Sequence, residues 1–274
     1  MPVHFDSLTE TKYSELFAWI LQEALENCND AFAQSNGKYF LGSAPLIDQK
    51  TGKEIGKFVF TFFSNIEQQR NEILDVDIVL NNDMSTEIIF SKKLPQSSDS
   101  NEYYEAITAE SGQHLIVETV NRYVEEREIE GETLSIYASA FPYGLTVFKN
   151  EKEFNKFFGF EKAINVADTG LRVHGLGTDF IMPGGILKDN DKTEKKPWSV
   201  VVGVVEDFSK VTIAFGENQY NAYIIQLHTA LGTIPVLAGT EMFNMKKLSK
   251  GRIVGMNAYI KANFVRNQYP KKQK

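Results

Sequence analysis

Residues 198–213 read WSVVVGVVEDFSKVTI, a dense run of valine and other strand-forming residues. Valine favours strands because its branched side chain packs well on a pleated surface. Gly203 and Asp207 interrupt the run. A glycine inside a strand pattern is typical of a sharp bend or of a close approach by another backbone, and small closed barrels need such bends. We therefore predict one long, bent strand here.

The residues that follow predict further strands separated by turns. Residues 221–230 form a second strand-like run, Leu231-Gly232 turns it, and residues 233–237 form a third. Residues 240–248 have the length of a short helix, and residues 252–265 form the last clear strand. The final third of the chain is therefore predicted to be a small β-domain.

This order of three strands, a short helix and a glycine-led strand resembles the OB-fold, a five-stranded Greek-key barrel. The sequence KGRIVG at 250–255 is similar to the lead into the fourth strand of that family, and the resemblance covers roughly 70 residues. Only residues 265–269 remain for a fifth strand, unless residues 252–264 bend and serve twice. The resemblance implies a barrel face that binds single-stranded nucleic acid or oligosaccharide.

The last strand alternates between an apolar and a polar set of side chains. We expect the apolar set to face inward; it comprises Val254, Met256, Ala258, Ile260, Ala262 and Phe264. We expect the polar set to face outward; it comprises Asn257, Tyr259, Lys261 and Asn263. Cationic, amide and aromatic groups on one face suit a nucleic-acid platform, although a plain polar exterior has the same pattern. The other candidates for base stacking are Phe208, Tyr220 and Tyr223, of which at least one is expected in the core.

The charge is unevenly distributed along the chain. Residues 195–274 hold 12 basic and 4 acidic residues, a net charge of +8. The rest of the chain has a net charge of −15, and the whole chain has a net charge of −7. Such an asymmetry suggests a polyanionic partner for the basic part, or pairing with the acidic part. The cationic candidates are Lys246, Lys247, Lys250, Arg252 and Lys261. A solvated lysine surface is the alternative.

The remaining residues predict an acidic α+β domain, residues 1–190, followed by a basic barrel, residues 195–274. Apolar spacing predicts helices at 7–33 and 101–126, the second with an interruption at Ser111-Gly112 left open, and a short helix that carries Phe154, Phe157 and Phe158. Strands are expected at 38–46 and 57–64, which form a hairpin, and at 74–80 and 86–91, which pair with each other. The polar run 188–197 has little to bury and marks the domain boundary. No internal repeat is visible in the sequence.

The sequence also limits compartment and chemistry. A single cysteine, Cys28, excludes an intrachain disulfide, and no apolar run approaches the roughly 18 residues of a membrane helix. We expect a cytoplasmic protein without membrane contact. Asp75 and Asp77 are the candidates for a metal site, and His174 opens a glycine-rich turn. Zinc, dinucleotide and nucleophile-elbow motifs are absent, so we expect no cofactor.

Three hypotheses follow. The first is a non-enzymatic binding protein whose basic barrel holds single-stranded nucleic acid or another polyanion. The second is a protein-interaction or assembly module, in which the barrel packs on its own acidic domain, on another protein or on a second copy. The third is an enzyme with a metal-assisted site near Asp75, Asp77 and His174.

Overall fold

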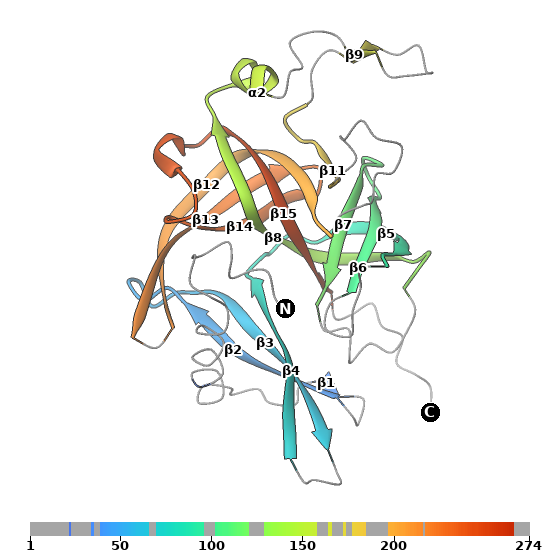
Figure 1. Cartoon of the computed structure of the whole chain (residues 1–274), viewed down its shortest axis with the longest axis vertical. Helices are drawn as coiled ribbons and strands as arrows, with labels where there is room; N and C mark the ends of the chain where they lie inside the picture. The colour runs from blue at the N-terminus through green and yellow to red at the C-terminus, as the bar shows by residue number, and fades with distance from the viewer. Residues whose placement is uncertain are drawn as a thin grey trace.

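The structure is a computed structural model and describes residues 22, 34–35, 39–65, 70–95, 102–120, 129–157, 164–165, 172–173, 177–184, 197–215 and 217–265. Strands dominate these residues (Figure 1). Before residue 130 the strands are β1 (Gln34–Ser35), β2 (Tyr39–Ile47), β3 (Glu54–Asn65), β4 (Arg70–Leu80), β5 (Thr86–Lys93), β6 (Glu102–Thr108) and β7 (His114–Thr119). After it they are β8 (Thr133–Phe148), β9 (Ile164–Asn165), β10 (Arg172–Val173), β11 (Ile181–Pro183), β12 (Ser199–Phe215), β13 (Asn218–Thr229), β14 (Gly232–Gly239) and β15 (Ile253–Phe264). The helical elements are α2 (Glu151–Phe157) and a 3₁₀ turn, η2 (Met245–Lys247).

The expected α+β class is wrong, because the described chain is almost entirely β. Residues 102–119 of the predicted helix 101–126 form the hairpin β6–β7 instead, in which Tyr104 and Ala106 alternate with less buried residues; residues 121–126 lie outside the described part of the chain. Gly112, at φ +66°, makes the turn that a helix would not contain. The other predicted long helix, 7–33, lies outside the described residues except for Gln22.

The strands β5–β8 and β12–β15 together form two closed rings of five strands each, and β8 and β15 belong to both rings. In the first ring, β5, β6, β7, β15 and β8 pair in that order, and β8 pairs back on β5. In the second ring, β12, β13, β14, β8 and β15 pair in that order, and β15 pairs back on β12. Each ring has one parallel contact, β7 with β15 and β14 with β8, and its other contacts are antiparallel.

The two rings are therefore built alike. Each consists of four consecutive strands, and each borrows its fifth strand from the other set: β15 completes the first ring and β8 the second. β8 and β15 pair along nearly their whole length, with Ala140 opposite Ile260. The predicted boundary at 190–195 falls between β11 and β12, and strands from both sides of it share this nine-stranded sheet.

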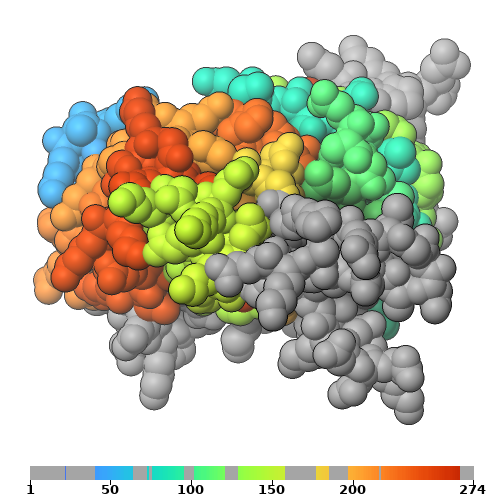
Figure 2. Space-filling model, turned by 90° about the horizontal axis from the view of Figure 1, so that it is seen from above, coloured from blue at the N-terminus to red at the C-terminus, as the bar shows by residue number. Residues whose placement is uncertain are grey.

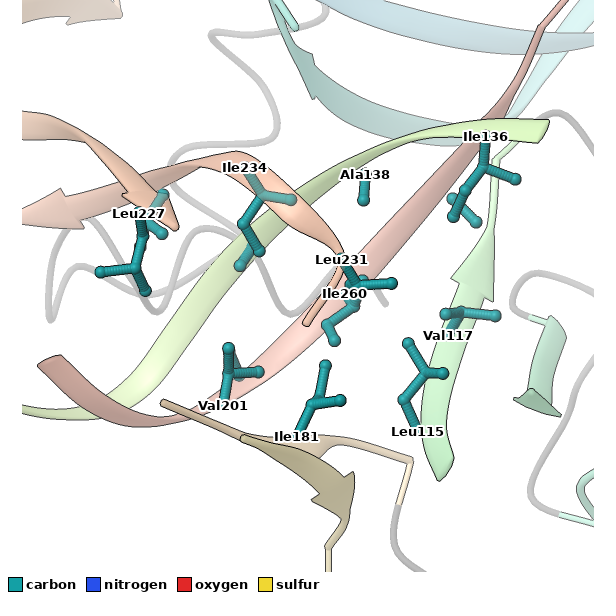
Figure 3. Close-up of a cluster of buried hydrophobic side chains, with 14 of the residues drawn as sticks. Leu115, Val117, Ile136, Ala138, Ile181, Val201, Leu227, Leu231, Ile234 and Ile260 are labelled. Atoms are coloured by element: carbon teal, nitrogen blue, oxygen red, sulfur yellow. The ribbon is translucent and has the colours of Figure 1, made fainter. Parts of the chain in front are cut away.

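One hydrophobic core runs through both rings. It contains Ile88 and Leu115 from the first ring, and Ile225 and Ile234 from the second. Figure 3 shows side chains from β7, β8, β12 and β15 directed toward one another in this core, with Ile181 of β11 beside them. All six residues of the predicted inward set of β15 are buried in it, which confirms their expected orientation.

The long strand β12 bends as its sequence predicts. Its first half, to Val204, pairs with β15, and its second half pairs with β13. The register shifts between Val205 and Asp207, so a β-bulge lies at the bend. At Gly203 a Cβ would lie 2.4 Å from the carbonyl oxygen of His228, so only glycine permits this close strand approach.

A second sheet, in the order β1-β2-β3-β4, packs on the second ring (Figure 1). The expected hairpin β2–β3 is confirmed, but β4 pairs with β3 and not with β5, so the predicted pairing of 74–80 with 86–91 is wrong. One face of the sheet, including Phe60 and Ile78, packs on Ile213 and Tyr220 of β12–β13. This contact buries the outer surface of the β12–β13 hairpin.

The β2–β3 turn is fixed to β12 through a buried carboxylate. Asp48 is 2 % exposed and accepts hydrogen bonds from the backbone N–H of Thr212 (2.8 Å) and the hydroxyl of Thr51 (2.6 Å). Burial alone would raise the pKa of Asp48, but the N–H of Thr212 and the other donors outweigh it and lower the pKa below its ordinary value. The ionised carboxylate therefore holds the two sheets together at this edge.

Candidate nucleic-acid interface

Three aromatic side chains from three adjacent segments meet on the outer face of the second ring. Ala258 of β15 pairs with Ser199 of β12 and with Pro142 of β8, so the neighbouring residues Trp198, Tyr259 and Tyr143 come together. The ring centroid of Tyr143 lies 5.3 Å from that of Trp198 and 5.8 Å from that of Tyr259. We call these three residues the aromatic row.

A β-bulge places Tyr143 in this row. Asn257 pairs with Gly144 and Ala258 pairs with Pro142, which leaves Tyr143 as the extra residue of β8. Bulges re-aim a side chain, and proline is tolerated in a strand at such a position. Tyr143 is 38 % exposed, more than most large apolar residues of the described chain. Burial, and after it Tyr259, raises the pKa of Tyr143 well above its ordinary value, so its phenol stays a neutral donor.

The other two rings of the row are held firmly. Gly184 donates its N–H to the carbonyl oxygen of Trp198 (2.8 Å), and a Cβ on Gly184 would lie 2.2 Å from the indole. The end of β11 thus lies against the indole, and glycine alone allows this. Tyr259 packs on a buried cluster that includes Tyr103 and Ile116. The row is therefore a rigid platform, of which Tyr143 is the exposed member.

A basic surface lies at the end of the second ring where β8 ends and β15 begins. α2 contacts both strands, and η2 contacts β8. The backbone is tied together there, because Arg252 donates to the carbonyl oxygen of Lys149 (3.0 Å). Figure 2 looks onto this end and shows α2 in yellow-green beside orange-red atoms of the C-terminal part. The cations of this basic surface are Lys149, Lys152, Lys156, Lys246, Lys247, Lys250 and Arg252.

Two lysines of the basic surface form ion pairs. Lys247 lies 2.9 Å from Glu153 of α2, and Lys250 lies 2.9 Å from Asp207 at the bulge of β12. Hydrogen bonds from these two lysines lower the pKa values of Glu153 and Asp207. All four side chains are well exposed, so each pair contributes little to stability and can exchange partners readily.

The basic surface carries a net positive charge in an acidic protein. Segments 149–157 and 241–252 and Asp207 hold seven cations and four carboxylates, a local charge of +3, whereas the whole chain carries −7. The charge pattern of the sequence predicted the four cations at 246–252. It did not indicate Lys149, Lys152 and Lys156, because they stand about 90 residues earlier and only the β8–β15 pairing brings them near. The sequence signal that could have indicated them is the presence of three lysines within the eight residues that follow a strand.

Lys261 does not belong to any surface, and its expected outward exposure is wrong. It is fully buried, and its ammonium group donates to Asp77 of β4 (2.6 Å) and to Glu118 of β7. Burial lowers the pKa of Lys261, but the charges of Asp77 and Glu118 outweigh burial and raise it overall. The side chain does point away from the ring core, as predicted, but a neighbouring strand from the second sheet covers it.

The other sequence candidates fall in different places. Asn257 is half-buried beside Gly144 of the outer face, as its position predicted. Tyr220 is in the core, which confirms that at least one stacking candidate is structural. Phe208 and Tyr223 are partly buried and contact each other on the β12–β13 hairpin. These two therefore lie outside the aromatic row.

Of the residues expected near a metal site, only Asp77 has its side chain in the described part of the chain. Asp77 is bound to Lys261, the side chain of Asp75 lies outside the described residues, and so does His174. Among described residues, no cluster of three or more histidine, cysteine, aspartate or glutamate side chains could hold a metal ion.

No protein-family model, no curated protein and no solved structure matches this chain. In the described segments, none of the helices has the length and apolar character needed to cross a bilayer. The fold and the geometry of the outer face therefore carry the functional argument by themselves.

Proposed function

We propose that this chain is a non-catalytic binding protein that holds a polyanion on the basic surface. The observation that carries the proposal is the convergence of seven cations from two distant segments at one end of the second ring. Cations gathered on one side of an otherwise acidic protein attract a phosphate-bearing chain by charge, and they release counter-ions when it binds.

The strand pairing supports an OB-type barrel in the second ring, with β8 in the place of the fifth strand. The ring has one long bent strand, β12, and a short helical turn, η2, before β15. In that family the face of the second and third strands binds ligands. Here the β2–β4 sheet covers much of this face, so the proposed binding region lies elsewhere, on the basic surface. A single cysteine supports the cytoplasm as its compartment.

A protein partner is the second candidate, and one observation favours it. Phe157 of α2 is 64 % exposed beside the basic surface. An exposed phenylalanine among lysines suits an acidic protein surface as well as a polyanion. Salt-dependent binding to phosphate-bearing probes, together with an unchanged mass in light scattering, separates the two candidates.

The test is fluorescence anisotropy of the full chain with labelled single-stranded oligonucleotides at about 50 and about 200 mM salt, where phosphate contacts are visible. The variant Lys246→Gln/Lys247→Gln/Lys250→Gln removes three cations of the basic surface. Lys50→Gln/Lys53→Gln/Lys92→Gln is the matched control, since it removes three exposed lysines elsewhere.

If each lost lysine contacts a phosphate, the salt slope falls by about 0.7 per contact, or about 2 in total. At about 100 mM salt this corresponds to an affinity loss of up to about 100-fold. The control variant should bind as the unaltered chain does. Equal affinity of the two variants, or no binding by the unaltered chain, would refute the proposal.

A further inference from the structure

We infer that the polyanion is a single-stranded nucleic acid whose bases stack on the aromatic row, with Tyr143 as the main contact. This inference rests on the proposed function and names the ligand class of the same surface. It goes beyond charge, because the aromatic row and the basic surface are separate observations on neighbouring parts of the second ring.

The position of the row relative to the basic surface carries the argument. Tyr143 lies on β8, which leads directly into Lys149 and α2. Tyr259 lies on β15, whose first residues follow Arg252. Both strands of the β8–β15 pair thus run from the aromatic row to the basic surface, and a ligand laid along them meets rings first and cations next.

The outer surface between the two ends is open near Tyr143 and covered by α2 near Lys149, because Phe154 of α2 packs on Phe148 and Ile253 in a buried cluster. Next to Tyr143, Gly144 pairs with Asn257 and Thr146 pairs with Gly255. The ligand would follow this stretch and then pass over α2, which carries Lys152 and Lys156. Thr146 is exposed and Asn257 is half-buried, so hydroxyl and amide groups are available along the path.

The chemistry of the row selects among polyanions. Polyphosphates, sulfated sugars and anionic lipid surfaces offer negative charge but no flat aromatic rings. Unpaired bases offer both, and every base has a π-face that stacks on tyrosine or tryptophan. A duplex keeps its bases stacked on one another, so it cannot use the exposed ring of Tyr143. The row therefore favours single strands over duplexes and over other polyanions.

The spacing sets a minimum ligand length. Six residues of strand separate Tyr143 from Lys149, which is about 20 Å at the usual strand rise. A strand rises about 3.4 Å per nucleotide while its bases stay stacked on one another and more when they separate to stack on protein rings, so at most about six nucleotides cover this distance. An oligomer of about two nucleotides reaches only one end, and one of about twelve reaches both.

The experiment compares three variants of the full chain. Tyr143→Leu removes the aromatic ring, whereas Tyr143→Phe keeps the ring and removes only the hydroxyl. The comparison of the two variants therefore tests whether stacking on the ring contributes to affinity, and Tyr143→Phe shows whether a substitution at this position disturbs the fold. Tyr137→Leu is the matched control, since Tyr137 is a half-buried tyrosine on the same strand outside the row. The probes are an oligothymidylate of about twelve nucleotides, one of about two, a duplex, and inorganic polyphosphate.

We expect Tyr143→Leu to lose at least about fivefold in affinity for the longer oligothymidylate. The same variant should bind polyphosphate unchanged, and Tyr143→Phe and Tyr137→Leu should bind every probe as the unaltered chain does. The shorter oligomer and the duplex should bind the unaltered chain more weakly than the longer single strand.

Two results would overturn the inference while leaving the proposed function intact. One is equal affinity of the unaltered chain for polyphosphate and oligothymidylate with no effect of Tyr143→Leu. The other is a drop in the mass from light scattering on Tyr143→Leu, which would assign the row to a contact between copies of this chain. If no probe binds the unaltered chain, the inference and the proposed function both fail.

Discussion

Replacing Lys261 with methionine should destabilise the protein severely. Lys261 is fully buried and joins Asp77 of the second sheet to Glu118 of the first ring. Methionine keeps most of the apolar stem, so the change removes the charge with little loss of packing. The two carboxylates, whose side chains are 11 % and 3 % exposed, then lack their cation.

Removing one partner from a buried ion pair costs about 3–5 kcal/mol. Here two carboxylates share the cation, so we expect the upper part of that range. A typical domain is stable by about 5–15 kcal/mol, so the variant should lose a large share of its free energy of unfolding. The loss comes from uncompensated charge, and for that reason Lys261→Met/Asp77→Asn/Glu118→Gln should recover more than half of it.

Urea unfolding monitored by circular dichroism measures these differences through the transition midpoint. Lys210→Met is the control, because Lys210 is exposed on β12, and it should change stability by less than about 0.5 kcal/mol. A loss of less than about 1 kcal/mol for Lys261→Met would contradict the argument. So would a triple variant less stable than the single one.

Three further predictions concern single contacts. Gly184→Ala should cost about 1–3 kcal/mol and shift the tryptophan emission, because its Cβ would displace the indole of Trp198; Gly144→Ala, whose Cβ would lie 3.5 Å from the nearest side chain, should do neither. Asp48→Asn should lower the midpoint of urea unfolding at pH 7, and the difference should shrink as the pH falls below about 4, since the lowered pKa of Asp48 stabilises the fold only while the group is ionised. A difference that persists unchanged at about pH 2 would contradict this reading. The difference in free energy of unfolding between the unaltered chain and Lys261→Met should narrow as the pH rises above about 10, because a raised lysine pKa stabilises fully below the unfolded value near 10.4 and that stability is lost at higher pH. A difference that stays unchanged above about pH 10.4 would contradict the role given to the Lys261 charge.

The strands of the second ring were largely predictable, because each is a run of strand-forming residues closed by a turn. The predicted strand 198–213 is β12, the next two runs are β13 and β14, and the final one is β15. The bend at Gly203 was also visible, since glycine in such a run has few other uses. Local patterns of this kind need no knowledge of distant residues.

The partners of these strands were not predictable. The sequence offered only 265–269 as a fifth strand, whereas β8 fills that place from more than 50 residues before β12. The likeness of the two rings was hidden as well, because it lies in the order of pairing and not in residue identities. The helix expected at 101–126 failed for a related reason, since two short alternating strands around Gly112 also give apolar residues at helix-like spacing.

The candidate site likewise contains positions that the sequence predicted and positions that it did not. The outward positions of Asn257 and Tyr259 followed from alternation along β15, and the structure agrees. Trp198 and Tyr143 joined Tyr259 only through pairing across three strands. The burial of Lys261 depends on Asp77, 184 residues away, and no local pattern signals such a partner.

The exchange of β8 and β15 between the rings has a consequence for synthesis and folding. Neither ring can close until the chain has been made as far as Phe264, because each ring needs both of these strands. In a chain that emerges from the ribosome, the strand edges of β5–β8 must therefore stay unpaired until more than 100 further residues have been synthesised. Contacts of such long range in the sequence make folding slow, and they make the two rings fold and unfold as one cooperative unit. A cut anywhere before β15 should leave no independently folded half, only exposed strand edges that invite aggregation.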